Sequence, residues 1–314
     1  MEKALLTTEH LRVGYGGEAA VHDVSFCLRA GETLAIAGES GCGKTTLLKA
    51  LMGVGGAQIT GGRAVFDGND LAAMRPNARR GLAGEQISMI FQDPGAAFNP
   101  IRSYDSQFRE LLRSRGRFRG AASRSEIRRC FASLGLSDGA RILKSCPCEL
   151  SGGMNQRAAV AAAMLLGPRL LLLDEPTSAL DVTAQQAVVE ELARLRSLTG
   201  LSMLLVTHNL GLAAAMADRT GVMYAGRLVE LGATADVLER PCHPYTKCLL
   251  RAVPALGGGL PQGLGGSPPA PGAPARGCAF FARCPAAAPG CRERETALRE
   301  ISPGHFAACA EGRP

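Results

Sequence analysis

One short segment of the chain has the residue types and the spacing needed to bind phosphate. Residues 38–45 read Gly-Glu-Ser-Gly-Cys-Gly-Lys-Thr and fit the pattern G-x-x-x-x-G-K-[ST]. The glycines let backbone N–H groups curl around phosphate oxygens, which a Cβ would obstruct. Lys44 can reach the β- and γ-phosphates of a nucleotide, and the Thr45 hydroxyl can ligate Mg²⁺. The segment predicts a site for a nucleoside triphosphate with Mg²⁺; the alternative is a glycine-rich turn without function.

Two adjacent carboxylates and one histidine lie where chemistry on that nucleotide would need them. Asp174 and Glu175 follow four leucines, and His208 follows the apolar run 203–207. Asp174, at the end of a buried strand, can hold Mg²⁺ directly or through water. Glu175 is one residue further on, so its side chain points elsewhere and can polarise an attacking water. We expect hydrolysis here; a plain loop start and a structural histidine are the alternatives.

Apolar runs around these residues predict the elements that position them. A buried strand should precede the phosphate segment, and a helix should follow it with its positive end toward the phosphates. Buried strands that alternate with a helix are typical of a parallel sheet. The expected strands span residues 33–37, 170–173 and 203–207, the expected helices span 46–51, 156–166 and 183–198, and a hairpin spans 223–232.

The motifs, taken in order, resemble the ATPase subunit of an ABC transporter. The order is the phosphate segment, Leu150 to Gln156, Asp174-Glu175 and Thr207-His208. Within that family, the segments 91–94, 98–100, 223–226 and 243–246 resemble the oligopeptide, dipeptide and nickel importers. The resemblance covers residues 5–255 and, separately, the C-terminal tail.

The resemblance implies a fold class and a division of the chain. The expected fold is α/β: an ABC-type P-loop ATPase core with an antiparallel β piece, an inserted helical subdomain and a small Cys-rich C-terminal appendage. The expected domains are an ATPase domain at 1–253 with the helical subdomain at about 91–160, a Gly/Pro linker at 254–277 and a Cys-rich tail at 278–314.

The resemblance also implies roles for single residues. Ser151, Gly152 and Gly153 would complete the ATP site of a second subunit, so that ATP is held between two ATPase domains. Gln92 resembles the Q-loop glutamine, and Asp181 resembles the D-loop aspartate at the dimer interface. Tyr15 stands where the family stacks an aromatic ring on adenine; an ordinary strand residue is the alternative. The expected catalytic residues are Lys44, Gln92, Glu175 and His208. The expected ATP-binding residues are Tyr15, Gly38, Ser40, Gly41, Gly43, Lys44, Thr45, Thr46, Ser151, Gly152, Gly153 and Asp181. The expected Mg²⁺ ligands are Thr45, Gln92 and Asp174.

Activity, partners and location follow from the same resemblance. It implies ATP hydrolysis that energises uptake of di- and oligopeptides, with a nickel or metal-chelate importer as the alternative in this branch. The expected partners are a second, homologous ATPase subunit in a heterodimer, two transmembrane permease subunits and an extracytoplasmic solute-binding protein, at the cytoplasmic face of the inner membrane. A non-transport ABC ATPase and a redox-sensing or metal-binding protein with a vestigial ATPase are alternatives of other classes.

Four positions depart from the usual pattern of the branch without removing a phosphate or metal ligand. Asn155 stands where a basic residue is usual, Asn209 where Asp is usual, and Cys146 and Cys148 where Tyr and His are common. We therefore expect activity. The Asn209 departure raises the hypothesis that His208 is held less firmly.

The charge of the chain is concentrated in one stretch. The net charge is +7, and residues 75–130 carry twelve Arg and no Lys against five Asp or Glu. The stretch lacks the interleaved aromatics that stack on bases, so no nucleic-acid partner is expected. It is interpreted as a solvated face near anionic headgroups or as a solvated face without a partner.

Hydropathy gives no sign of a segment that enters a membrane. The start of the chain has no basic segment followed by an apolar stretch, so no secretory signal is expected. The longest strongly apolar run, 158–166, is nine residues, and a spanning helix needs about twenty. Membrane attachment is therefore expected through partners.

The C-terminal tail contains four of the eleven cysteines. A short tail with few apolar residues cannot bury a sufficient core, so another interaction must stabilise its fold. Four thiolates can hold a [4Fe–4S] cluster or a tetrahedral zinc. The gaps are longer than those of zinc sites, and the similarity to tails of peptide-importer ATPases implies the cluster; zinc and unmetallated thiols are the alternatives. The ligands would be Cys278, Cys284, Cys291 and Cys309. His305 is a spare zinc ligand, expected at the surface, and the other seven cysteines are expected to be small buried side chains.

Overall fold

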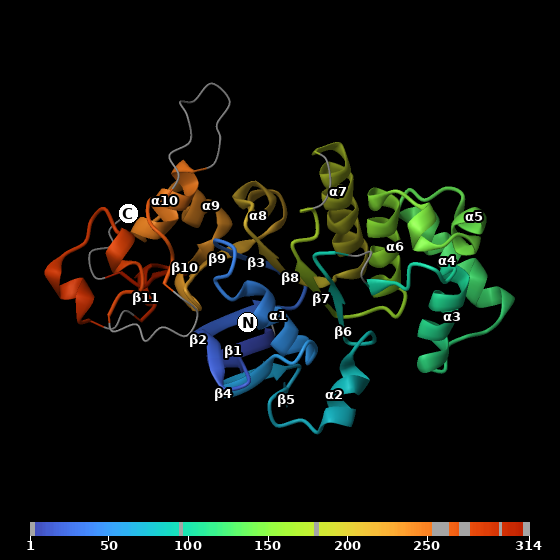
Figure 1. Ribbon diagram of the computed structural model, residues 1–314, viewed down its shortest axis with the longest axis horizontal. Coiled ribbons are helices and arrows are strands. Elements are labelled where there is room, and N and C mark those ends of the chain that lie inside the picture. The colour runs from blue at the N-terminus through green and yellow to red at the C-terminus, as the bar shows by residue number, and fades with distance from the viewer. Residues whose placement is uncertain are drawn as a thin grey trace. The chain divides into compact units, whose positions relative to one another are not determined.

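The structure is a computed structural model that describes residues 4–93, 97–178, 182–252, 264–269, 277–294 and 297–309 (Figure 1). The chain divides into two compact units. Unit 1 comprises residues 1–79 and 204–314, and unit 2 comprises residues 80–203. The helix α2 (Pro76–Leu82) and the strand β8 (Ser202–Thr207) carry the chain from one unit to the other.

The other elements of unit 1 are the strands β1 (Ala4–Tyr15), β2 (Glu18–Arg29), β3 (Thr33–Ala37), β4 (Gln58–Phe66), β5 (Asn69–Asp70), β9 (Arg219–Tyr224), β10 (Arg227–Ala233), β11 (Arg299–Ser302) and β12 (His305–Ala307), the helices α1 (Lys44–Met52), α8 (Leu210–Met216), α9 (Thr234–Glu239) and α10 (Pro244–Arg251), and the 3₁₀ turns η3 (Phe281–Arg283) and η4 (Pro289–Arg292). Those of unit 2 are β6 (Ile87–Ile90), β7 (Leu170–Asp174), α3 (Tyr104–Ser114), α4 (Ala121–Ser133), α5 (Gly139–Lys144), α6 (Gly152–Met164), α7 (Val182–Thr199) and η2 (Pro147–Glu149).

Unit 1 contains two sheets of different kinds. An antiparallel sheet has the strand order β2-β1-β4-β5. In the second sheet, β3 pairs in parallel with β9, and β9 pairs antiparallel with β10. Every residue of β3 is buried, as expected for a strand covered on both faces. The strand predicted at 33–37 and the hairpin predicted at 223–232 are thereby confirmed.

The Cys-rich segment is built into unit 1 rather than appended to it. Its hairpin, β11 and β12, extends the second sheet, because β12 pairs antiparallel with β10 (Figure 1, red beside β10). Phe280 is 1 % exposed and packs in a core cluster with Tyr224, Tyr245 and Val237. A hairpin added to a sheet and a buried aromatic ring therefore hold the segment in place.

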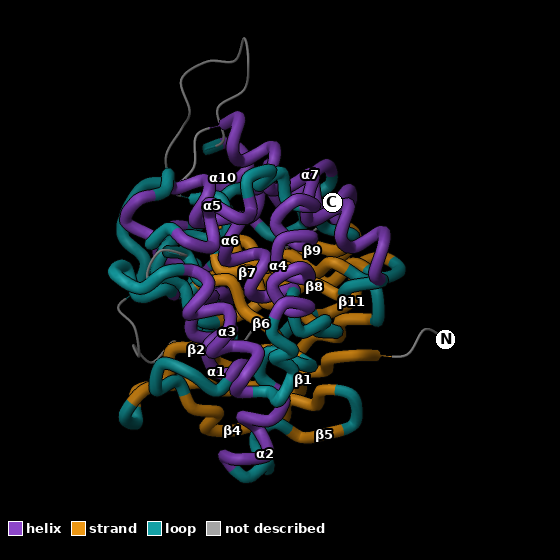
Figure 2. The backbone as a smooth tube through the Cα atoms, turned by 90° about the vertical axis from the view of Figure 1, so that its right-hand side faces the viewer, coloured by secondary structure: helices purple, strands orange, loops and turns teal. Residues whose placement is uncertain are grey.

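Unit 2 consists of two parallel strands and a group of helices. β6 and β7 pair in register, and the four leucines of β7 are fully buried. The helices α3 to α6 contact one another (Figure 2). On α3 the buried side chains Tyr104, Phe108 and Leu112 recur every four residues, so they share one face of the helix. The predicted helix at 183–198 corresponds to α7, and the predicted strands at 170–173 and 203–207 correspond to β7 and β8.

Across the described ranges, no helix combines the length and the apolar character needed to cross a membrane.

Candidate nucleotide site and cysteine segment

The phosphate loop lies between β3 and α1 and is packed closely by its own chain. A Cβ on Gly38 would lie 2.2 Å from the backbone oxygen of Met223, and one on Gly43 would lie 2.7 Å from that of Ala20. Gly43 also has a φ of 104° where it caps α1, a conformation that L side chains rarely adopt. Glycine is therefore required at both positions by contacts within unit 1.

Lys44, the lysine of the motif, is buried within this loop. Its ammonium group donates hydrogen bonds to the backbone oxygens of Gly38 at 2.8 Å and Glu39 at 2.9 Å, and it lies 3.8 Å from Cys42 Sγ. Burial raises the pKa of the Cys42 thiol, as expected for a small filler rather than a nucleophile. Thr45 and Thr46 follow in the first turn of α1, and Ser40 and Gly41 are exposed.

Two side chains from distant parts of unit 1 hold Glu39, the second residue of the loop. The Tyr245 hydroxyl accepts the Glu39 backbone N–H at 3.0 Å. Arg283, in the Cys-rich segment, donates to both Glu39 carboxylate oxygens, at 2.8 and 3.0 Å. Local sequence patterns could not predict these two contacts, because 206 and 244 positions separate the residues from Glu39.

In unit 2, the structure brings Gln92 to Glu175. The Gln92 side-chain amide donates to the Glu175 carboxylate at 3.4 Å. Glu175 has a φ of 46°, in the left-handed region that costs free energy for a side chain with a Cβ. Asp174 ends β7 and is 2 % exposed. The two carboxylates therefore lie at the end of β7, the second of them on a strained backbone.

The Ser-Gly-Gly motif begins α6. The Ser151 hydroxyl caps this helix by accepting the Met154 N–H. A Cβ on Gly152 or Gly153 would meet nothing within 4 Å, so the rest of the chain does not require glycine there. Four residues along, the buried Gln156 amide donates to the Pro176 backbone oxygen at 2.6 Å and ties α6 to the loop that contains Glu175.

The remaining predicted residues lie in different places. Tyr15 is 38 % exposed at the end of β1, and His208 is exposed before α8. The Asn209 side chain caps α8 by accepting the N–H groups of Gly211 and Leu212. Asp181 falls outside the described residues. The phosphate loop, Tyr15 and His208 thus belong to unit 1, and Gln92, the Ser-Gly-Gly motif and both carboxylates belong to unit 2.

The four tail cysteines lie close enough for their thiols to affect one another. Burial raises the pKa of Cys278, and the thiols of Cys309 and Cys291 raise it further. Burial also raises the pKa of Cys284, with additional contributions from the other three thiols. The Cys278 N–H donates to the Cys291 carbonyl at 2.9 Å. One segment therefore gathers four partly buried sulfur atoms.

Two expectations about this part of the chain and the other cysteines were wrong. His305 is not at the surface: it is 3 % exposed, because β12 pairs with β10, and its Nε2 lies 2.7 Å from the Glu230 carboxylate. The same carboxylate accepts the N–H groups of Cys242 and His243. Of the seven other cysteines, only Cys42 and Cys242 are buried; four are partly buried, namely Cys27, Cys130, Cys146 and Cys248. Cys148 is exposed, because it lies in the short turn η2 before the Ser-Gly-Gly motif.

Glu230, Cys242 and His305 are the single set of three metal-type ligands that converge within the described ranges. Both carboxylate oxygens already accept backbone N–H groups, and one imidazole nitrogen faces that carboxylate. Cys242 Sγ lies 4.0 Å from His305 Nδ1, and the thiol also donates to the Arg240 backbone oxygen at 3.7 Å. The arrangement is a hydrogen-bonded connection between β10, β12 and the start of α10.

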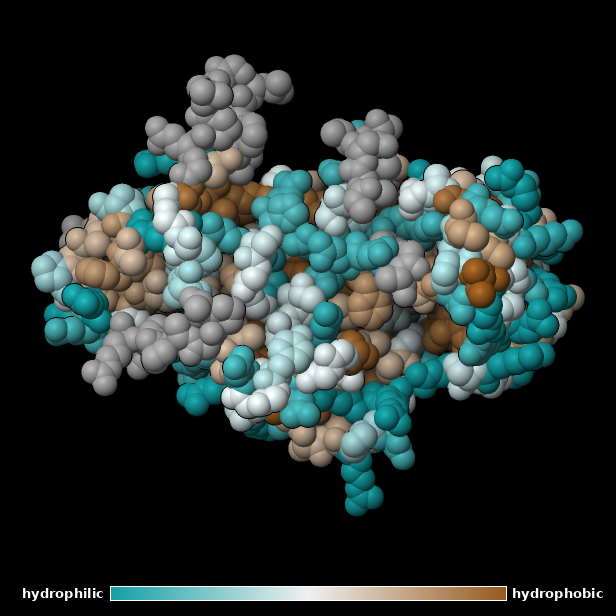
Figure 3. Space-filling view, viewed as in Figure 1, coloured by the Kyte–Doolittle hydropathy of each residue, from teal (hydrophilic) through white to brown (hydrophobic). Residues whose placement is uncertain are grey.

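Many guanidinium groups of the Arg-rich stretch have partners within the chain. Arg109 and Arg124 pair with Asp105, and the Arg124 guanidinium, beside Asp105, lowers the pKa of that carboxyl. Arg115 donates to the backbone oxygens of Arg80 and Gly81. The visible face over α3 to α5 is mostly hydrophilic (Figure 3). The stretch therefore contributes to the internal structure of unit 2 as well as to its solvated surface.

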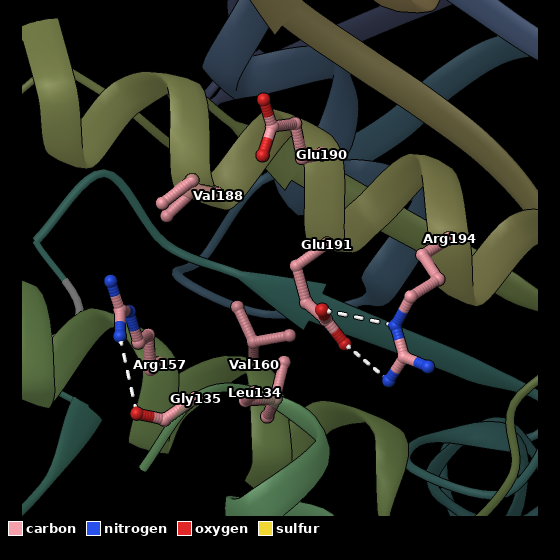
Figure 4. A pocket seen from close by; sticks show the side chains of 9 residues that line it. Leu134, Gly135, Arg157, Val160, Val188, Glu190, Glu191 and Arg194 are labelled. Carbon is pink, nitrogen blue, oxygen red and sulfur yellow. Dashed lines mark hydrogen bonds and ion pairs between the residues drawn. The ribbon is translucent and has the colours of Figure 1, made fainter.

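A pocket of about 270 Å³ opens between α4, α6 and α7 of unit 2 (Figure 4). Its charged groups are already engaged: Glu191 pairs with Arg194, and Arg157 donates to the Gly135 backbone oxygen. None of the predicted site residues lines it.

Comparison with known proteins gives the family. The ABC transporter model matches residues 21–178, and the model of the oligopeptide/dipeptide transporter C-terminal region matches residues 229–291. The chain is 42 % identical to the dipeptide transport ATP-binding protein DppD of Bacillus subtilis, over 91 % of this chain and 88 % of that protein. It is 40 % identical to the oligopeptide transport ATP-binding protein OppD of Escherichia coli, over 98 % and 93 %.

Solved structures show the same fold at lower identity. The structure of cbiO1 from Clostridium perfringens, part of the ABC transporter complex cbiONQ, matches with a TM-score of 0.66 and 24 % identity, over 76 % of this chain and 92 % of that one. The ABC-type fold expected from the sequence is therefore confirmed. The chain belongs to the ABC transporter ATPases and, within them, to the peptide-transport ATP-binding proteins.

Proposed function

We propose that this chain is the ATP-hydrolysing subunit of an importer of di- and oligopeptides. The observation that carries the proposal is the union, in one chain, of an ABC ATPase domain with the oligopeptide/dipeptide C-terminal region. The relatives DppD and OppD match nearly the whole chain, and their names favour peptides over nickel and over a non-transport ATPase.

The motif residues are proposed to act on ATP. Lys44 would exchange the backbone oxygens of Gly38 and Glu39 for phosphate oxygens, because an ammonium group bonds more strongly to an anion. Glu175 would orient water for attack on the γ-phosphorus, and Gln92 would hold that carboxylate. His208 would contact the γ-phosphate, and Tyr15 would stack on the adenine ring.

The donor set of the motifs fits Mg²⁺. Asp174 ends a buried strand with a carboxylate, and Thr45 presents a hydroxyl in the first turn of α1. Oxygen atoms of these kinds are the ligands that Mg²⁺ prefers. Thr45, Asp174 and Gln92 would hold the ion, which supplies positive charge opposite the phosphate oxygens.

The Ser-Gly-Gly motif supports a second ATPase subunit. Gly152 and Gly153 are open on the side where a Cβ would project, and Ser151 is exposed at the N-terminal end of the 13-residue helix α6. Backbone N–H groups at such an end attract phosphate. We infer that this turn contacts ATP bound to a different, homologous subunit, and that Asp181 lies at the same interface.

The membrane partners are inferred from the family. Two permease subunits would bind the ATPase pair at the cytoplasmic face of the inner membrane, and an extracytoplasmic binding protein would deliver the peptide. Attachment through these permeases would be peripheral. The Arg-rich stretch would lie near the anionic headgroups of that membrane.

The four tail cysteines are proposed to hold a [4Fe–4S] cluster, with zinc as the alternative. The support is the gathering of four partly buried thiols in one segment, where Cys291 and Cys309 contribute to the raised pKa of Cys278 and Cys284. No three of these described sulfur atoms lie within 4.8 Å of one another, so the proposal rests on the cysteines and not on a converged site. The test is the iron, acid-labile sulfide and zinc content of anaerobically purified protein. About four irons and four sulfides per chain, lost in Cys284→Ser, would support the cluster; stoichiometric zinc would replace it, and neither metal would leave free thiols.

Uptake in cells tests the substrate. Cells that lack this chain should lose uptake of labelled di- and oligopeptides, and the wild-type chain should restore it while Glu175→Gln should not. Loss of nickel uptake with unchanged peptide uptake would contradict the peptide assignment.

A further inference from the structure

The side chain of Arg283 joins the Cys-rich segment to the phosphate loop. Its guanidinium group donates to both oxygens of the Glu39 carboxylate, at 2.8 and 3.0 Å. The Arg283 side chain is 5 % exposed and that of Glu39 is 27 % exposed. A paired, two-point bond that is largely shielded from water fixes direction as well as distance.

Arg283 is itself held in one orientation. Its Nε donates to the backbone oxygen of Gly265 at 2.9 Å, and one terminal nitrogen also donates to the Tyr224 hydroxyl at 3.3 Å. The guanidinium carbon lies 5.7 Å from the Tyr224 ring centre and 6.0 Å from that of Phe280. Both rings belong to the core cluster that anchors the segment, so the arginine is a rigid extension of that cluster.

Glu39 passes this restraint to the atoms that would meet phosphate. Its backbone N–H donates to Tyr245, a member of the same aromatic cluster, and its backbone oxygen accepts Lys44 Nζ. The side chain, the N–H and the oxygen of one loop residue are therefore each fixed by a different group. A loop whose N–H groups are already placed needs less ordering when phosphate binds.

We propose that Arg283 is a positioning residue for the phosphate loop, and that it raises the affinity for ATP by holding Glu39. The inference rests on the proposed function only in taking Mg²⁺·ATP as the ligand. It concerns ground-state binding, because Arg283 bonds the loop and not the carboxylates of unit 2. The fold of the Cys-rich segment thereby becomes a determinant of ATP affinity.

The test compares Arg283→Gln, Glu39→Gln and the double variant by equilibrium binding of Mg²⁺·ATP to the full chain. Each single variant should raise Kd about tenfold, the effect of losing one charge-assisted pair. The double variant should also lie near tenfold, because both changes remove the same bond. In the assembled complex, KM should rise similarly and kcat should stay within about twofold. Arg292→Gln, an exposed arginine of the same segment, is the matched control and should bind ATP normally.

Two results would overturn the proposal: Kd within about twofold of wild type in both single variants, or a double variant whose effect is the product of the singles. If Arg283→Gln fails to fold by circular dichroism and thermal unfolding, Glu39→Gln alone decides, since it keeps the size of the side chain. A wild-type chain that binds no Mg²⁺·ATP would instead contradict the proposed function.

Discussion

The phosphate loop and the Ser-Gly-Gly turn look alike in sequence and differ in structure. Each is a glycine-rich turn before a helix, which is a general site for anions. In the phosphate loop, glycines lie against neighbouring backbone, and Tyr245 and Arg283 hold Glu39. In the other turn, Gly152 and Gly153 face open space and Ser151 caps the helix. The first is held in place by its own chain, and the second is the turn that we propose contacts ATP on a second subunit.

The largest expected effect separates nucleotide binding from hydrolysis. Glu175→Gln keeps the shape of the side chain but removes the carboxylate that would orient water. Hydrolysis should fall at least ~100-fold, because a lost electrostatic contact costs roughly 3–4 kcal/mol in the transition state. ATP affinity should be unchanged, since the phosphate loop is intact. Steady-state hydrolysis and equilibrium binding check the two parts, and near-normal turnover would refute the role of Glu175.

Alanine at a glycine of each turn tests the comparison itself. In Gly38→Ala the new Cβ would meet the Met223 oxygen at 2.2 Å, so the loop must shift. Overpacking of this kind costs about 1–3 kcal/mol of unfolding free energy, and ATP Kd should rise at least about tenfold as the N–H groups move. Gly152→Ala has room for its Cβ and should keep both stability and binding. Equal losses in the two variants, measured by denaturant unfolding and ATP titration, would break the distinction.

On the phosphate-loop side, His243 should make the stability of the chain depend on pH. Burial lowers the pKa of His243 from 6.5 to about 4, and its Nδ1 accepts the Tyr245 N–H that begins α10. The unfolded chain therefore binds a proton at a higher pH than the folded chain. Stability is complete above pH 6.5 and is lost as the pH falls toward 4, by roughly 2 kcal/mol between pH 7 and pH 5. His243→Asn keeps a capping acceptor and should flatten this part of the profile, as denaturant unfolding at the two pH values would show; an unchanged slope would exclude His243 as its source.

The smallest expected effect concerns the Asn209 cap of α8, which belongs to neither the phosphate loop nor the Ser-Gly-Gly turn. Asn209→Ala removes the acceptor for two N–H groups of α8 and should cost about 1 kcal/mol of unfolding free energy. Asn209→Asp keeps the acceptor and should be neutral or slightly stabilising. If aspartate at this position also leaves the ATPase rate unchanged, the hypothesis that Asn209 weakens the position of His208 is rejected; a faster rate would support it.

The sequence predicted what depends on local pattern and could not predict what depends on distant pairing. β3, β7 and β8 lie where short apolar runs predicted buried strands, and the motif glycines lie between β3 and α1, as the predicted strand and helix require. The link from Arg283 to Glu39 spans 244 positions, and no spacing rule indicates it. His305 was predicted at the surface and is buried, because the pairing of the distant strands β12 and β10 places it against Glu230. The aromatic run around Phe280 was the available signal that the tail has its own anchor.

Reconstituted vesicles can show whether this chain couples ATP hydrolysis to peptide uptake. The chain would be assembled with its permease and ATPase partners, and ATP hydrolysis would be measured with and without peptide-loaded binding protein. The rate of ATP hydrolysis should rise when peptide-loaded binding protein is added, and Glu175→Gln in this chain should abolish hydrolysis. A rate of hydrolysis that does not change with peptide, or that persists in Glu175→Gln, would contradict the coupling of ATP hydrolysis to peptide uptake.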